Sequence, residues 1–259
     1  MAPIAVAGLA YLNAKTSFSN DLRLMSSYIG AVVKTRLREN ADRLNPFYKL
    51  EEYAQNRKTA DNILLIYGNR QWSYKELYEI VLKYGTWLKN VQGVKPKDVV
   101  ALDHMNSERF IFLWLGIWSI GAKPAFINYN LTSKALAHCI RVSTASLVFI
   151  DPEIASNVSQ DVYDELPNLQ FVTFTPELQA EVMAVEGIRQ PDSIRSGEEG
   201  TAMGLLIYTS GTTGLPKPAI VSWNKLVIMS HHVPSWLGLR QGDVFYTVRS
   251  FHLLFILTY

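Results

Sequence analysis

Short apolar runs alternate along most of this chain with segments whose apolar residues recur every three or four positions. Runs of about four to eight apolar residues are typical of buried strands, and the wider spacing is typical of helices packed by one face. The runs predict strands at 63–67, 71–74, 99–102, 125–127, 147–150, 171–174, 204–208, 219–221 and 244–248. The spaced segments predict helices at 22–37, 74–88, 110–120, 133–142, 176–185 and 225–237. This alternation predicts an α/β fold with a mostly parallel sheet layered by helices.

Polar residues and glycines mark several expected boundaries. Ser73 with Glu76 three residues later is typical of a capping box at a helix start. Ser107 is expected to cap the next helix, which Gly121 is expected to end. Residues 186–203 are polar and rich in Gly, Ser and Glu, which predicts a linker or a surface loop.

Composition and charge exclude several classes of protein. The chain has 259 residues, of which 48% are apolar and 19% charged, as in ordinary globular proteins. Its net charge of +2 and the lack of a basic stripe argue against a nucleic-acid partner. The single cysteine, Cys139, excludes an internal disulfide and is expected to be a buried structural thiol. No His/Cys spacing typical of a metal site occurs, so no metal ligands are predicted.

The N-terminal 44 residues carry two unusual segments. The apolar run 1–12 is shorter than the roughly 20 residues that span a bilayer, and no basic residue precedes it as in a secretory signal. The amphipathic segment 22–37 ends among Lys34, Arg36 and Arg38. A basic amphipathic helix beside an apolar segment favours attachment to a membrane surface. A helix docked on the body of the protein would give the same pattern, and both interpretations stay open.

One loop carries the strongest chemical signal. It joins the strands expected at 204–208 and 219–221, and it concentrates hydroxyl side chains and glycines. Glycine lets a backbone approach a ligand closely, and successive N–H groups in such a turn form a concavity that binds anions. A nearby lysine adds a compact positive charge. We therefore expect a polyphosphate to bind the candidate residues Thr209, Ser210, Gly211, Thr212, Thr213, Gly214 and Lys217.

Two other phosphate-binding patterns are excluded here. The Walker pattern places its lysine directly after the second glycine and opens a helix. Here Lys217 comes three residues after Gly214 and follows a proline. The dinucleotide pattern G-x-G-x-x-G does not occur. A polar surface hairpin without function is the remaining alternative.

A second candidate lies at the end of the strand expected at 125–127. Ligands in such sheets bind beyond the carboxyl ends of the strands, where Asn128 and Asn130 follow directly. These asparagines either line the site or merely form the turn, because asparagine hydrogen-bonds its own local backbone.

The loop resembles the phosphate-binding loop of the adenylate-forming, or AMP-binding, enzymes. The segment LIYTSGTTGLPKPAI at 206–220 carries the resemblance to this superfamily. The stretch IGAKPAFINYN at 120–130 is similar to the fatty acid transport protein and very-long-chain acyl-CoA synthetase family in its fungal form. FLWLG at 112–116, VFID at 148–151 and AIVSW at 219–223 also fit.

The resemblance implies a reaction and its co-substrates. It implies that a fatty acid reacts with ATP to an acyl-adenylate and pyrophosphate, and that CoA then displaces AMP. The attacking group is the carboxylate of the substrate, so no catalytic residue is assigned in this chain. The resemblance also implies Mg²⁺ and an intracellular, membrane-associated protein of the endoplasmic reticulum, peroxisome, lipid droplet or plasma membrane.

The resemblance predicts an incomplete adenylation domain. Residues 1–44 are expected to be a membrane-associated or docking segment, 45–248 a partial AMP-binding domain, and 249–259 an aberrant tail. The Mg²⁺-binding glutamate, the ribose-binding aspartate and the C-terminal lysine of the family would follow Tyr259, so we expect the chain to be inactive alone. A sheet edge and apolar surface would stay uncovered, which predicts poor solubility.

Two further functions compete with this interpretation. The first is a membrane-associated lipid-transport or scaffold protein without ligase activity. The second is a sister adenylating enzyme that activates a short-chain or amino acid. The basic N-terminal segment and the stretch at 120–130 favour a fatty acid over the second alternative.

Overall fold

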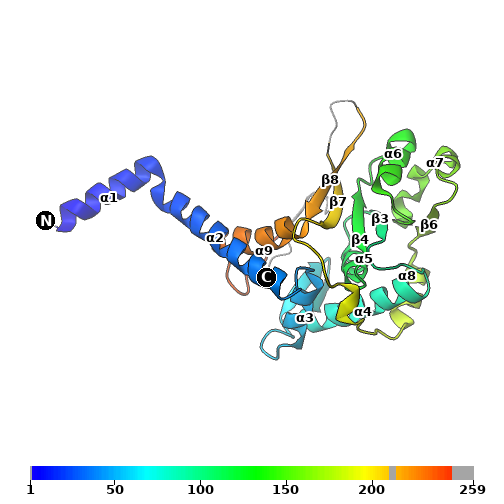
Figure 1. The fold of residues 1–259 in the computed structure, drawn as a ribbon, viewed down its shortest axis with the longest axis horizontal. Helices are drawn as coiled ribbons and strands as arrows, with labels where there is room; N and C mark the ends of the chain where they lie inside the picture. The colour runs from blue at the N-terminus through cyan, green and yellow to red at the C-terminus, as the bar shows by residue number, and fades with distance from the viewer. Residues whose placement is uncertain (1, 210–213, 247–259) are drawn as a thin grey trace.

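A six-stranded sheet forms the centre of the computed structural model, which describes residues 2–209 and 214–246 (Figure 1). Its strand order is β6-β5-β3-β4-β7-β8; the first five strands run parallel and β8 runs antiparallel to β7. The predicted α/β fold with a mostly parallel sheet is therefore confirmed. The strands are β3 (Val99–Asp103), β4 (Lys123–Ile127), β5 (Leu147–Ile150), β6 (Gln170–Thr173), β7 (Met203–Thr209) and β8 (Lys217–Ser222).

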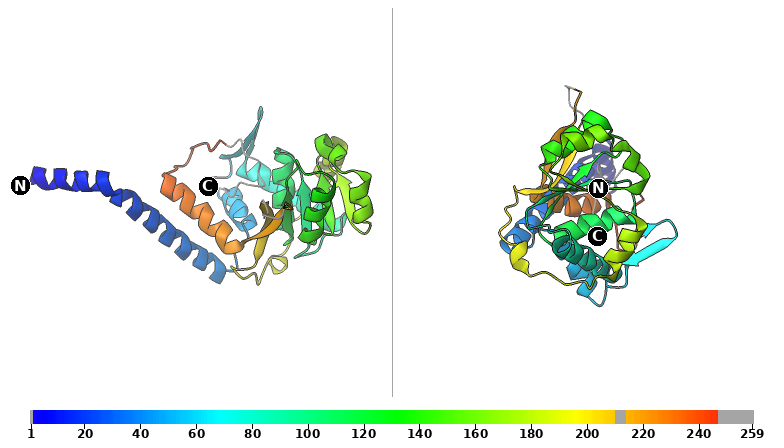
Figure 2. Two further views of the ribbon diagram at one scale, coloured as in Figure 1. Left: turned by 90° about the horizontal axis from the view of Figure 1, so that it is seen from above. Right: turned by 90° about the vertical axis from the view of Figure 1, so that its right-hand side faces the viewer.

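Helices cover both faces of this sheet (Figures 1 and 2). Alternate side chains of β3 point to opposite faces, as the pleat requires. Val100 and Leu102 join the larger core with the first group of helices, and Ala101 joins the smaller core with the second. The first group is α3 (Phe47–Gln55), α4 (Tyr74–Asn90), α5 (Glu108–Ser119) and α8 (Pro176–Ala184); the second is α6 (Ser133–Ser143) and α7 (Gln160–Glu165).

Local signals in the sequence give most boundaries correctly. Ser73 and Glu76 form the predicted capping box at the start of α4, and Ser107 accepts a hydrogen bond from the N–H of Phe110 at the start of α5. Gly121 follows α5 with φ +76°, and a Cβ there would lie 2.2 Å from the carbonyl oxygen of Ile194. Glycine is thus required both by the backbone angle and by the close approach.

Two smaller features complete the body of the protein. The strands β1 (Ile63–Tyr67) and β2 (Arg70–Ser73) form a separate antiparallel hairpin. A 3-10 turn, η1 (Pro152–Asn157), follows β5. The strand predicted at 244–248 is wrong over its described part, because residues 244–246 form no strand. Residues 247 and 248 lie outside the described ranges.

An N-terminal arm extends from the body. It consists of α1 (Ala2–Thr16) and α2 (Phe18–Asn40), and α2 packs along α9 (Trp223–Leu237) while α1 projects away (Figures 1 and 2). The residues of α2 that are buried are small: Ser27, Ala31 and Thr35. Within the described residues, no helix combines the length and the apolar character needed to cross a bilayer.

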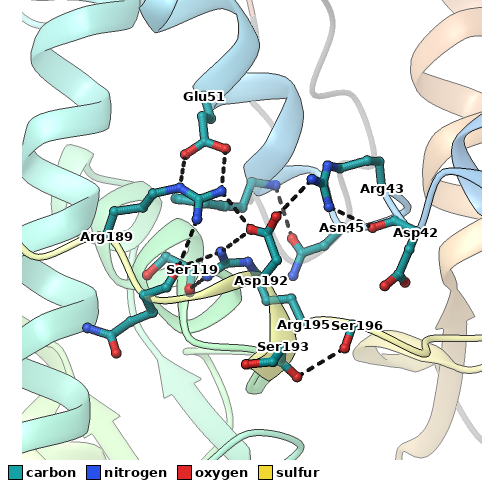
Figure 3. Close-up of polar contacts among 12 residues, drawn as sticks. Asp42, Arg43, Asn45, Glu51, Ser119, Arg189, Asp192, Ser193, Arg195 and Ser196 are labelled. Atoms are coloured by element: carbon teal, nitrogen blue, oxygen red, sulfur yellow. Dashed lines mark hydrogen bonds and ion pairs between the residues drawn. The ribbon is translucent and has the colours of Figure 1, made fainter.

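The polar segment 186–203 was expected to form a linker or a surface loop, and most of its residues lie at the surface. It is irregular apart from η2 (Asp192–Ile194) and Met203, the first residue of β7, yet it is bound tightly to α3 and α5 (Figure 3). Arg195 is fully buried, and its guanidinium carbon lies 4.5 Å from the ring centroid of Phe47. Its side chain also donates hydrogen bonds to the carbonyl oxygens of Ser119 and Gln190. The segment is therefore part of the packed structure rather than a flexible connection.

Candidate functional site

The hairpin of β7 and β8 presents the ends of the candidate loop. Thr209 and Lys217 are register partners at its loop end, and the Thr209 hydroxyl donates a hydrogen bond of 3.5 Å to the Lys217 carbonyl oxygen. Both residues are exposed. Ser210, Gly211, Thr212 and Thr213 lie outside the described residues, so the predictions for them stay predictions.

Two described residues of the loop have properties that favour anion binding. Gly214 has φ +87°, an angle that L side chains rarely adopt, and its α-carbon is open to an approaching ligand. The side chain of Lys217 makes no ion pair with any described residue, so its ammonium group is available to an anion. This end of the hairpin therefore places a cation, unpaired among the described residues, beside an open stretch of backbone.

Helix α6 holds both strands of the hairpin. The Tyr208 hydroxyl donates a hydrogen bond of 2.6 Å to the carbonyl oxygen of Cys139. The ring Nε2 of His138 lies 3.1 Å from the carbonyl oxygen of Pro216, the residue before Lys217. Neither contact was predicted from the sequence, because His138 lies within an ordinary amphipathic helix.

The carboxyl ends of the parallel strands lie at the same edge as this loop. Asp103 pairs in register with Ile127 on one side and with Ile150 on the other. Asn128 follows Ile127 directly, and its Oδ1 accepts hydrogen bonds of 3.1 Å from both the backbone and the side-chain nitrogen of Asn130. The two asparagines thus make a local turn at the edge where ligands bind in such sheets.

A buried polar cluster at this edge was missed by the sequence reasoning. Asp103 is fully buried at the end of β3, and neither carboxylate oxygen has a hydrogen-bond partner among the described residues. The next residue, His104, places its Nδ1 2.9 Å from the Asp151 carboxylate. Asp151 also accepts hydrogen bonds from the backbone N–H groups of Glu153 and Met105. The sequence did contain a signal for this cluster, because both aspartates directly follow apolar segments that were predicted as strands.

The two aspartates differ in their acidity. Burial and the neighbouring Asp151 carboxylate raise the pKa of Asp103 to about 7. Burial alone would also raise the pKa of Asp151, but the hydrogen bonds and charge of His104 and the two backbone N–H groups outweigh it and lower that pKa. Asp151 therefore carries the negative charge of the pair, and Asp103 tends to keep its proton.

The surroundings of Cys139 explain its low reactivity. Cys139 is buried in the smaller core, and burial raises the pKa of its thiol to about 12. A thiol of this kind is a poor nucleophile, as expected for a structural cysteine. Across residues 2–209 and 214–246, no group of three or more His, Cys, Asp or Glu side chains could hold a metal ion.

Comparison with known proteins identifies relatives of this chain. The family model described as "AMP-binding enzyme" matches residues 51–258, which extends past Val248. The very long-chain fatty acid transport protein of Saccharomyces cerevisiae is 38% identical over 168 residues, which cover 60% of this chain and 24% of that protein. Its counterpart in Cochliobolus heterostrophus is 30% identical over 250 residues, which cover 94% of this chain and 38% of that protein. The chain thus spans well under half the length of these relatives.

Solved structures confirm the fold. The o-succinylbenzoate CoA synthetase of Bacillus subtilis, in complex with its acyl-adenylate intermediate, matches with a TM-score of 0.59 and 22% identity. The match covers 75% of this chain and 46% of that enzyme. An N-terminal subdomain of NpsA from Klebsiella oxytoca matches with a TM-score of 0.56 over 70% of this chain. At these identities the likeness concerns the fold alone.

Proposed function

Because the chain belongs to the AMP-binding enzyme family, we propose that it supplies the ATP-phosphate-binding part of a fatty acyl-CoA synthetase. The reaction would join a fatty acid to CoA, with ATP converted to AMP and pyrophosphate. The observation that carries the proposal is the hairpin end, where exposed Thr209 and Lys217 flank a glycine of positive φ. The names of the fungal relatives favour long or very long fatty acids as substrate.

The residues of this chain would act by binding and positioning. In the proposed reaction the carboxylate of the fatty acid attacks ATP, so the protein supplies no nucleophile. Lys217 would neutralise charge on the triphosphate, and the Thr209 hydroxyl and the backbone near Gly214 would orient it. We extend this role to Ser210, Gly211, Thr212 and Thr213 on sequence grounds. ATP would bring Mg²⁺ with it, and we assign no metal ligand and no catalytic residue among the described residues.

The N-terminal arm belongs to the same proposal. We propose that residues 1–44 attach the protein to an intracellular membrane surface, where long-chain fatty acids partition. The exposed large apolar residues of α1 and α2 support this role, and so do the names of the relatives, which are fatty acid transport proteins. Residues 45–248 would then form the adenylation part.

ATP binding tests the loop directly. We expect Lys217→Ala to weaken ATP binding about tenfold or more, because a charge-assisted contact to phosphate is lost. Thr212→Ala should weaken it less. Lys225→Ala is the matched control, because Lys225 is an exposed lysine at the start of α9. Unchanged affinity in both loop variants would reject the assignment of the loop.

Pyrophosphate release separates the competing functions. A fatty acyl-CoA synthetase that contains this chain should release pyrophosphate from ATP with palmitate or a longer acid. A lipid-transport or scaffold protein should release none with any acid. Release with a short-chain or amino acid alone would favour the sister adenylating enzyme.

A further inference from the structure

We propose that His138 is a positioning residue that fixes Lys217 of the hairpin for its ligand. This inference rests on the proposed function, since it assigns a role within the same site. It is carried by the hydrogen bond between α6 and the residue that immediately precedes Lys217. His138 does not itself touch the nucleotide in this proposal.

The geometry fixes the direction of this hydrogen bond. A carbonyl oxygen can only accept, so the Nε2 of His138 must carry the hydrogen that points at the oxygen of Pro216. The carbonyl group of Pro216 shares one planar peptide unit with the N–H of Lys217, so its direction is coupled to the start of β8. The contact therefore restrains the backbone that carries Lys217.

The helix that carries His138 is itself firmly placed. Leu136, Ala137, Cys139 and Ile140 of α6 are all buried in the smaller core against the sheet. His138 is the half-buried residue among them, and its side chain reaches the hairpin. The Tyr208 hydroxyl restrains the other strand through the Cys139 carbonyl. Adjacent residues of one helix thus hold both strands at the point where the candidate loop begins and ends.

The loop end of the hairpin gains from such support because its described residues are exposed. Thr209, Gly214 and Lys217 are exposed, and the link between the Thr209 hydroxyl and the Lys217 carbonyl oxygen is a long 3.5 Å. Within the part of the chain that the structure describes, β8 is the edge strand of the sheet and pairs on one side only. A lysine that must meet a phosphate at a defined place gains precision from a restraint next to it.

Hydrogen exchange and ATP binding together test this role. We compare His138→Ala, which removes the donor, with His138→Gln, whose side-chain amide can replace Nε2–H. Arg141→Ala is the matched control, because Arg141 lies one turn along α6 and pairs with Glu165, away from the hairpin. We expect amide exchange at the start of β8 to accelerate about two- to tenfold in His138→Ala, with exchange in β3 and β5 unchanged. The affinity for ATP should fall by a similar factor, and His138→Gln should restore both.

The outcomes separate this inference from the proposed function. Unchanged exchange at the start of β8 in His138→Ala, or an equal effect in Arg141→Ala, would overturn the restraint. Faster exchange with wild-type affinity for ATP would overturn the link to the ligand. ATP binding by the wild-type protein tests the proposed function separately, because the exchange measurement requires no nucleotide.

Discussion

Asp103 is a residue whose acidity departs far from its ordinary value. Its carboxyl is buried at the end of β3, without a hydrogen-bond partner among the described residues, and faces the charge of Asp151. Ionising such a group in the folded protein is costly, whereas the unfolded chain ionises it freely. The position therefore links the stability of the sheet edge to pH.

The direction of this pH dependence follows from the raised pKa. The pKa of Asp103 is about 7 in the fold, against an ordinary value of 3.8, so the folded state holds a proton that the unfolded state has lost. The contribution of Asp103 to stability should fall as pH rises from about 4 to about 7, by up to about 1.4 kcal/mol per pH unit, and then level off. Burial lowers the pKa of His231 to about 4, so that residue contributes a slope of opposite sign up to about pH 6.5. Asp103→Asn should remove the falling contribution and leave stability rising with pH over this window, which urea unfolding at several pH values measures.

The control for Asp103 is another aspartate in a different setting. Asp61→Asn changes an exposed side chain and should leave the slope intact. The carboxyls with lowered pKa, which include Asp151, Glu51 and Asp192, lose their contribution only as pH falls below about 4. They therefore act outside this window. A wild-type slope in Asp103→Asn would contradict the assignment.

At the scale of elements, the segment 186–203 is mostly irregular and yet connects several parts of the fold. It meets α3 through the Arg189–Glu51 ion pair and the connection between α2 and α3 through the Arg43–Asp192 pair (Figure 3). Near its end, Glu198 lies 2.6 Å from the Lys123 ammonium at the start of β4; Lys123 is buried, and the side chain of Glu198 is 10% exposed. Glu198 also accepts a hydrogen bond of 2.9 Å from the indole N–H of Trp223. The segment thus connects α3, the sheet and α9.

This connection predicts a large effect of one substitution. Glu198→Gln keeps an acceptor for Trp223 but leaves the Lys123 charge buried without its counterion. We expect a loss of about 3 kcal/mol in the free energy of unfolding, measured by urea denaturation. The double variant Lys123→Met/Glu198→Gln should lose less of its free energy of unfolding, because no unpaired charge remains buried. Glu199→Gln, at the exposed neighbouring residue, is the control and should be nearly neutral.

The sequence predicts these elements unevenly, for a physical reason. β5 was predicted to the residue and α4 from its capping box, because periodicity and caps are local signals. The burial of Arg195 was not predictable, because Phe47 and Ser119, which contact it, are distant in the chain. In the site, the hydroxyl-rich loop was evident from composition alone. His138 was not, because its partner Pro216 is 78 residues away.

At the scale of the whole molecule, the N-terminal arm exposes an unusually apolar surface. α2 buries small residues against α9 and leaves its large apolar residues exposed, which reverses the usual arrangement. Ile29 is 58% exposed and Val33 54% exposed, one helical turn apart. Residues 1–44 also carry six Lys or Arg and three Asp or Glu, a net positive charge. Such a surface suits an anionic lipid bilayer, and in water it favours self-association.

Vesicle binding is therefore the prediction for the arm as a whole. We expect the protein to sediment with vesicles of phosphatidylcholine and phosphatidylserine, less so at high salt. The double variant Ile29→Glu/Val33→Glu should bind at least about tenfold more weakly, because it removes two apolar side chains that would otherwise enter the lipid. Its melting temperature should stay close to that of the wild type, because both side chains are exposed in the fold.

A second double variant separates apolar contact from charge. Asn20→Glu/Ser26→Glu adds the same two charges to exposed polar positions of α2 and should keep most of the vesicle binding. If both variants lose binding equally, electrostatic attraction alone holds the arm to lipid. If neither loses it, the exposed apolar residues of α2 have another partner. Size-exclusion chromatography then decides whether that partner is a second copy of this chain. If α2 mediates self-association, the wild type should elute as an aggregate and Ile29→Glu/Val33→Glu as a monomer.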